Sequence, residues 1–209
     1  RPLVLLLGGA KVSTKLEIIN SFIHKADKII IGGGMAFTFL KAMGYNVGKS
    51  LIESSMIEEA RTIIDLARAS GKKIILPIDF ICAEDINSAP TNSEINIRNI
   101  PENLMGLDIG PESIENFNEA LDVSSTIIWN GPMGVFENSS FSNGTKLIAD
   151  NLVRLVEKNV NVIAGGGDTA SALKNFNLIE KITHVSTGGG ASLELMSGRS
   201  LKALERLEV

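Results

Sequence analysis

Hydrophobic residues along this chain form short continuous runs, and these runs alternate with longer stretches of helical spacing. Residues 3–7 are all apolar, as expected for a strand that is covered on both faces. Residues 53–69 repeat apolar side chains such as Ala60 and Ile63 at intervals of three and four, the period of an amphipathic helix. Gly71 lies just beyond this stretch and is predicted to end the helix.

The same pattern divides most of the chain into strands and helices that follow one another in turn. The predicted strands comprise residues 3–7, 28–31, 73–81, 126–129, 160–164 and 184–185. The predicted helices comprise residues 13–24, 35–43, 53–69, 111–120, 142–158, 169–176 and 191–196. Pro77 is expected to split the third strand, and residues 84–101 are predicted to be irregular or to form a short antiparallel excursion.

Alternating strands and helices indicate a parallel sheet with right-handed crossovers. The predicted fold class is therefore α/β: a doubly wound, Rossmann-like parallel sheet in three layers, α/β/α, forming a single domain over residues 1–209. A chain of 209 residues with 44% hydrophobic residues is large enough to bury such a core. Because Arg1 is followed almost at once by a strand, we expect the sequence to be part of a longer chain.

Composition argues against several classes of function. A formal net charge of −4 disfavours a general nucleic-acid binder, which carries a basic surface. Cys82 is the only cysteine and there are two histidines, so we expect no disulfide, no thiolate cluster and no histidine metal site. No apolar run reaches the length of a membrane span and no signal segment is evident, so we expect a cytoplasmic protein with no membrane partner.

Four glycine clusters lie where a predicted strand ends and a helix begins, at residues 8–9, 32–34, 165–167 and 188–190. Consecutive glycines cost backbone entropy and contribute no side chain, so packing is not expected to explain them. A bare backbone lets N–H groups approach an anion at a helix N-terminus. In parallel sheets, ligands bind at the carboxyl ends of the strands near a topological switch point. The clusters therefore predict a phosphate-rich ligand, above all a nucleotide.

Two common nucleotide motifs do not fit this sequence. Residues 44–50 approach the phosphate loop G-x-x-x-x-G-K-[ST], but they have one intervening residue too few and follow a helix instead of a strand. The dinucleotide fingerprint G-x-G-x-x-G is absent after the first strand. A nicotinamide-dependent enzyme on a similar sheet is therefore the weaker alternative.

Charged residues beside the glycines are candidates for binding phosphate and metal. Lys11 and Lys15 are four apart, so a helix beginning near Lys11 would present both ammonium groups to an anion; the alternative is a solvated basic face. Asp168 follows three glycines and precedes a predicted helix. We interpret it as a ligand of a Mg²⁺ ion that bridges nucleotide phosphates. The alternative is that Asp168 caps the helix, and the two roles are compatible.

Residues 129–137 follow a predicted strand and are rich in turn formers. Asn130 and the nearby backbone are candidates for phosphate contacts. Val135 and Phe136 are candidates for lining an apolar pocket, and Glu137 for accepting hydrogen bonds from ribose hydroxyls. The alternative is an ordinary tight turn.

Six motifs in this order resemble the phosphoglycerate kinase family, specifically its C-terminal nucleotide-binding domain. They are GGAKVSTK, GGGMAFTF, MGLDIGPESI, WNGPMGVFE, GGGDTA and HVSTGGGASLEL, and they extend from Leu7 to Leu195. No single tripeptide is specific, whereas six motifs in register are. The resemblance implies that residues 1–209 correspond to that domain, without the N-terminal phosphoglycerate-binding domain of the family.

The resemblance also implies roles for individual residues. Lys15 resembles the family's nucleotide-phosphate lysine, and Lys11 resembles the lysine near the transferred phosphoryl group. Gly188, Gly189 and Gly190 resemble the backbone nest that faces this group, and together with Lys11 they are the expected catalytic residues. The nucleotide-binding residues implied are Gly9, Ala10, Lys15, Gly33, Gly106, Leu107, Asn130, Pro132, Val135, Glu137, Gly166, Gly167, Asp168 and Thr169.

The activity implied is transfer of a phosphoryl group between 1,3-bisphosphoglycerate and ADP, giving 3-phosphoglycerate and ATP in glycolysis. Mg²⁺, held by Asp168, is the implied cofactor, and the implied partners are ADP or ATP. Phosphoryl transfer needs in-line positioning and stabilisation of charge more than covalent chemistry by the protein. Because the phosphoglycerate site belongs to the other domain, we expect this chain alone to bind nucleotide as a monomer with little or no turnover. A non-catalytic, regulatory nucleotide-binding module is the alternative.

Overall fold

A six-stranded parallel sheet forms the centre of the computed structural model, which describes residues 2–91, 93–186 and 188. Its strand order is β3-β2-β1-β7-β8-β9, and every neighbouring pair is parallel. The strands are β1 (Leu3–Leu7), β2 (Lys28–Ile31), β3 (Lys73–Ile75), β7 (Thr126–Asn130), β8 (Asn161–Gly165) and β9 (His184–Ser186). The chain winds outward in one direction from β1 and in the other from β7, so the topological switch point lies between these two strands.

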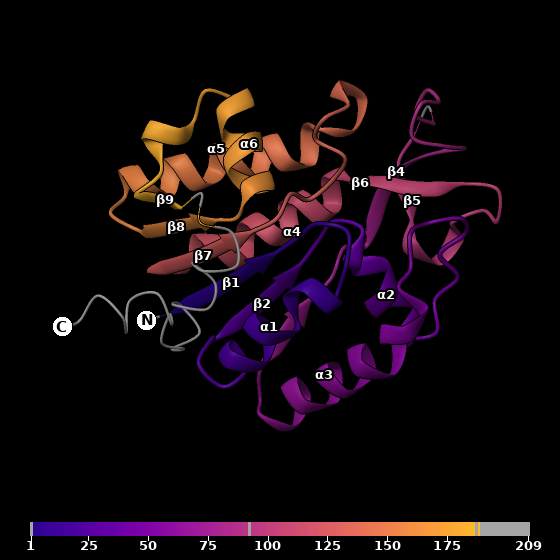
Figure 1. Cartoon of the computed structure of the whole chain (residues 1–209), viewed down its shortest axis with the longest axis horizontal. Helices are drawn as coiled ribbons and strands as arrows, with labels where there is room; N and C mark the ends of the chain where they lie inside the picture. The colour runs from indigo at the N-terminus through magenta and orange to yellow at the C-terminus, as the bar shows by residue number, and fades with distance from the viewer. Residues whose placement is uncertain (1, 92, 187, 189–209) are drawn as a thin grey trace.

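Helices cover both faces of the sheet (Figure 1). Successive side chains of a strand point to opposite faces, so Leu5 and Leu7 of β1 pack on one side while Val4 and Leu6 pack on the other. The first side is covered by α1 (Leu16–Phe22), α2 (Met35–Ala42) and α3 (Ile57–Ala69), and the second by α4 (Pro111–Asp122), α5 (Asn143–Glu157) and α6 (Gly167–Asn175). The predicted doubly wound α/β/α fold is confirmed.

A second, three-stranded antiparallel sheet lies beside the main one (Figure 1). It has the order β5-β4-β6, with β4 (Asp79–Ala83), β5 (Ile95–Asn96) and β6 (Met105–Ile109). The predicted strand over residues 73–81 is therefore two strands in two different sheets, divided around Pro77 as expected. The antiparallel excursion within residues 84–101 is confirmed by β5. Strand β6 was not predicted, because Gly106 and Asp108 interrupt its apolar pattern and both residue types are rare in strands.

The small sheet also holds the start of α4. The carboxylate of Asp79 accepts hydrogen bonds from the backbone N–H groups of Glu112 (3.0 Å) and Ser113 (2.7 Å), two donors in the first turn that have no partner within the helix. The Ser113 hydroxyl in turn accepts from the N–H groups of Ile78 and Asp79 at 2.9 and 3.1 Å. This exchange ties the first turn of α4 to the start of β4.

Several predicted boundaries shift by one to three residues. The predicted helices over residues 13–24 and 53–69 each begin with a short 3-10 turn, Ser13–Lys15 and Ser54–Met56. Gly71 has a φ of +64°, consistent with its predicted place after the end of α3. The helix predicted over residues 191–196 lies outside the described residues. Within the described part of the chain, no helix is long and apolar enough to span a membrane.

Candidate functional site

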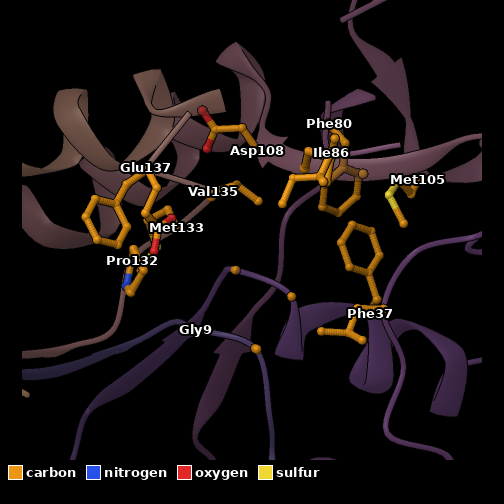
Figure 2. Close-up of a pocket in the computed structure, with 18 of the residues that line it drawn as sticks. Gly9, Phe37, Phe80, Ile86, Met105, Asp108, Pro132, Met133, Val135 and Glu137 are labelled. Carbon is orange, nitrogen blue, oxygen red and sulfur yellow. The ribbon is translucent and has the colours of Figure 1, made fainter. Parts of the chain in front are cut away.

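A pocket of about 490 Å³ opens at the carboxyl ends of β1, β2 and β7, between the parallel sheet and the small antiparallel sheet (Figure 2). We refer to it as the switch-point pocket, because β1 and β7 flank the point where the strand order reverses. Nine residues that the sequence pointed to line it together. They are Gly9, Ala10, Gly33, Gly106, Leu107, Pro132, Val135, Glu137 and Asp168. Phe136, predicted to face an apolar pocket, also lines it.

One half of the pocket is an apolar slot. Phe37 of α2 and Phe80 of β4 face each other with ring centroids 4.6 Å apart, and Ile86 and Met105 complete the wall (Figure 2). A Cβ atom at Gly106 would overlap the ring of Phe37, so glycine is required there for the ring to close the slot. Sequence reasoning missed the two phenylalanines, because apolar residues on a helix and a strand have the pattern of ordinary core.

The other half of the pocket is formed by glycine-containing turns that touch one another through the backbone. The N–H of Gly9 donates to the carbonyl of Pro132 (2.9 Å), and the carbonyl of Gly9 accepts from the N–H of Met35 (2.9 Å). Gly33 has a φ of +63°, and a Cβ atom there would lie 2.5 Å from the Gly9 nitrogen. Contrary to expectation, close packing of turns therefore explains part of the glycine content at this edge.

Gly167 is different from these packed glycines. It is the first residue of α6, it is exposed, and a Cβ atom added to it would meet nothing within 4 Å. The helix is capped by Gly166 at a φ of +97°, without a side-chain hydrogen bond, so the alternative role of Asp168 as the N-cap is wrong. Asp168 instead lies in the first turn, exposed and at the pocket wall.

Lys15 links the start of the first helical segment to the end of β7, where the following loop begins. Its ammonium group donates to the side-chain oxygen of Asn130, whose amide nitrogen donates to the carbonyl of Gly165 (2.5 Å). The hydroxyl of Thr169 accepts from the N–H of Gly131 (2.7 Å) and ties α6 to the same loop. Burial lowers the pKa of Lys15, and the negative charge of Asp168 partly offsets this effect. The predicted phosphate-binding residues thus lie together beside the pocket.

Lys11 does not share this environment. The helical segment begins at Ser13, two residues later than the expected start near Lys11, and Lys11 lies exposed in the preceding loop. Neither lysine is among the residues that line the pocket, but Lys15 is half-buried whereas Lys11 is exposed. Of the predicted glycine nest, Gly188 donates its N–H to the Ser186 hydroxyl at 3.3 Å, and the other two members, residues 189 and 190, lie outside the described residues.

Asp108 is a wall residue that sequence reasoning also missed (Figure 2). Its carboxylate is 2% exposed and accepts from the N–H groups of Gly144 (2.7 Å), in the first turn of α5, and Ile109 (2.9 Å). Loss of hydration raises its pKa to about 7, although both hydrogen bonds oppose the rise. The neighbouring Thr145 hydroxyl accepts from the N–H groups of Met133 and Gly134 at 3.0 and 3.2 Å. The start of α5 therefore positions the loop that forms one pocket wall.

The site has one acidic residue suited to a shared metal ion. Among the described residues, no group of three or more histidine, cysteine or acidic side chains is arranged to hold a metal. Asp168 is exposed at the wall, next to the N-terminus of α6. One carboxylate is a fitting donor set for Mg²⁺ only when a phosphate-bearing ligand supplies further oxygens. The residues present are therefore compatible with a metal that arrives with its nucleotide.

The sequence model of one protein family, phosphoglycerate kinase, matches residues 1–199 of this chain. The chain belongs to the phosphoglycerate kinase family. The phosphoglycerate kinase of Geobacter metallireducens is 51% identical over 208 residues, which are 100% of this chain and 52% of that protein. That of Thermosipho africanus is 48% identical over 205 residues, 98% of this chain and 51% of the relative.

Solved phosphoglycerate kinase structures have the same fold. The structure from Coxiella burnetii matches with a TM-score of 0.93 at 39% identity, over 99% of this chain and 53% of that one. The structure from Pyrococcus horikoshii matches with a TM-score of 0.81 at 30% identity, over 100% of this chain and 52% of that one. The chain spans about half the length of the phosphoglycerate kinases it matches.

Proposed function

We propose that this chain binds ADP or ATP in the switch-point pocket, as the nucleotide-binding half of a phosphoglycerate kinase. The observation that carries the proposal is the meeting, in one pocket, of an apolar slot and the N-terminus of α6. The slot, walled by Phe37 and Phe80, suits a purine base. The helix N-terminus and its bare Gly167 suit a phosphate.

The proposed orientation follows from the two ends of the pocket. With the base in the apolar slot, against the wall that Phe37 and Gly106 help to form, the ribose hydroxyls come within reach of Glu137, an exposed carboxylate on the loop after β7. The phosphates then extend toward Gly166 and Lys15. A bound phosphate would offset the desolvation of the Lys15 ammonium group, because an adjacent negative charge favours the protonated form.

Asp168 is the residue proposed to hold Mg²⁺ with the nucleotide. When bound, the metal ion would neutralise part of the phosphate charge. The chain's own contribution is to place one exposed carboxylate at the wall, close enough to Lys15 for the two charges to interact. Thr169, one residue later, positions this turn through its hydrogen bond to the β7 loop.

For the whole enzyme, we propose phosphoryl transfer between 1,3-bisphosphoglycerate and ADP. The chemistry needs donors aimed at the charge that spreads over the transferred group. The proposed donors are Lys11, which is exposed in the loop after β1, and the residues 188–190. The phosphoglycerate site would come from the half of the relatives that this chain does not cover, so we expect little or no turnover by the chain alone. A monomeric state and a cytoplasmic location stay predictions.

Calorimetric titration of the chain with ADP, with and without Mg²⁺, tests the proposal. We expect saturable binding with a Kd between roughly micromolar and millimolar, about −8 to −4 kcal/mol. Asp168→Asn should weaken binding of the Mg²⁺ complex more than binding of free ADP. Asp85→Asn is the matched control, because Asp85 also lines the pocket but lies by the apolar slot. Equal losses in both titrations of Asp168→Asn would remove the metal role, and absence of binding by a folded chain would refute the proposal.

A regulatory module without catalysis is distinguished by Lys11. Because Lys11 is exposed and lies outside the group that Lys15 forms with Asn130 and Asp168, Lys11→Ala should leave ADP affinity nearly unchanged. In a chain that also carries the phosphoglycerate-binding half, the same substitution should lower phosphoryl transfer by roughly 10²–10³. Transfer that is unaffected would favour the regulatory alternative.

A further inference from the structure

A second pocket, of about 420 Å³, lies at the C-terminal ends of α2 and α3 beside the edge strand β3. We call it the α2–α3 pocket. Its lining comes from the end of α2, the last turns of α3 and residues 72–78, together with Tyr45 and Ile97, and the described lining residues of the two pockets do not overlap. Its volume is within the range of small-molecule sites, about 300–1,000 Å³.

The floor of the α2–α3 pocket is apolar. Leu40 and Ala67 are buried beneath it, and Ile64 and Ile74 are half-buried in its sides. At the rim, Met43 is 49% exposed. An apolar floor that reaches solvent through an exposed apolar rim is typical of a surface that a ligand covers.

The polar lining of this pocket has one sign of charge. Arg68, Lys72 and Lys73 line it, and none of the described lining residues is acidic, although the whole chain has a net charge of −4. The dipole at the C-terminus of α3 accounts for a cation at Arg68, but it does not account for Lys73 on β3.

The ion pairs that Arg68 and Lys72 make differ in exposure. Arg68 lies 3.5 Å from Asp65, with both side chains more than 60% exposed, and the Lys72 ammonium group lies 3.9 Å from the Asp27 carboxylate. The exposed pair of Arg68 contributes little to stability, whereas the side chains of Lys72 and Asp27 are only 20% and 31% exposed. A ligand anion in the pocket can therefore approach Arg68 without disrupting a strong pair.

We propose that the α2–α3 pocket binds a small amphipathic carboxylate, with its alkyl chain on the apolar floor and its carboxylate among Arg68, Lys72 and Lys73. Charge complementarity selects the anion, and the limited volume selects a single short chain. The proposal does not depend on nucleotide binding, because it uses a different set of residues.

The test uses the 209-residue chain, with its isoleucine methyl groups labelled for NMR, and sodium octanoate below its micelle concentration. Saturable shifts are expected at Ile64 and Ile74, which line the α2–α3 pocket, but not at Ile86, which lines the switch-point pocket. Octyltrimethylammonium, with the same chain and the opposite charge, should bind at least tenfold more weakly. Shifts at Ile86 alone, equal binding of the two amphiphiles, or no saturation by about 10 mM octanoate would overturn the proposal.

Charge-reversal variants test which cations bind the carboxylate of octanoate. Reversal of two exposed cations in Arg68→Glu/Lys73→Glu should weaken octanoate binding about tenfold at low salt. Lys41 is an exposed cation on α2 that does not line the pocket, so Lys41→Glu should leave octanoate binding unchanged. Thermal unfolding confirms that each variant is folded. Sedimentation of the ligand-free chain tests whether a second copy of the chain occupies the pocket instead. A dimer that dissociates in the Met43→Glu variant would assign the pocket to a second copy and overturn the proposal.

Discussion

The buried carboxylate of Asp108 is expected to make the chain less stable as the pH rises from about 5 to 7. Burial raises its pKa to about 7 in the folded chain, whereas the ordinary value is 3.8. Between these values the folded state keeps the proton that the unfolded state has lost. The stabilisation associated with this proton is complete below pH 3.8, and it is lost as the pH rises through this window to the folded pKa.

The magnitude follows from the width of the window. One protonation difference changes the free energy of unfolding by about 1.4 kcal/mol per pH unit, so about 2–3 kcal/mol is lost between pH 5 and 7. Little further change from this group is expected above pH 8. The loss comes from holding the ionised carboxylate away from water, because the hydrogen bonds from Gly144 and Ile109 favour the ionised form.

Urea denaturation of the chain and of Asp108→Asn at several pH values isolates this contribution, because all other groups titrate in both proteins. The amide has one acceptor oxygen for the two N–H groups of Gly144 and Ile109, so the variant should be less stable at pH 5. The gap between the two proteins should then shrink by about 2–3 kcal/mol by pH 7. A gap that is constant or widens would show that Asp108 is ionised normally in the fold, and would refute the argument.

Three further substitutions have outcomes set by the geometry. Gly167→Ala should leave the free energy of unfolding unchanged or raise it by up to about 1 kcal/mol. The same variant should bind ADP about tenfold more weakly in calorimetry. Unchanged affinity would mean that no phosphate binds at the N-terminus of α6. Gly106→Ala should cost about 1–3 kcal/mol in chemical denaturation, because its Cβ overlaps Phe37, and stability equal to the parent would contradict this packing. Ser113→Ala should cost about 1–3 kcal/mol in the same assay, since it leaves the N–H of Asp79 without its acceptor; a loss below 0.5 kcal/mol would show that water replaces the hydroxyl.

The parallel sheet was predictable from the sequence because its central strands β1, β2 and β7 are buried on both faces. A strand such as β1 or β8 then shows as a short apolar run whatever its neighbours are. Strand β6 has no such signature. Gly106 packs against the ring of Phe37, and Asp108 accepts a hydrogen bond from the first turn of α5. These two tertiary contacts require residues that break the apolar pattern by which the strand could have been predicted.

The polar end of the candidate site was predictable for a similar reason. Glycines, lysines and aspartates at strand ends are unusual enough to be noticed, and the structure brings Lys15, Asn130 and Asp168 close together. The apolar slot was not predictable, because Phe37 and Phe80 satisfy the same periodicity as core residues. Only the fold, which brings α2 and β4 together at the pocket, shows that these two side chains wall a slot.

The glycines themselves divide into two classes that the sequence alone does not separate. At Gly33 and Gly106, an added Cβ atom meets the protein, so folding by itself requires glycine. At Gly167, an added Cβ atom meets open space at an exposed first turn, and folding does not require glycine there. The cost of a flexible residue at that position then needs another reason, and a ligand that approaches the backbone is the one consistent with the helix N-terminus. For this reason a single glycine, more than the number of glycines in the motifs, supports the proposed phosphate site.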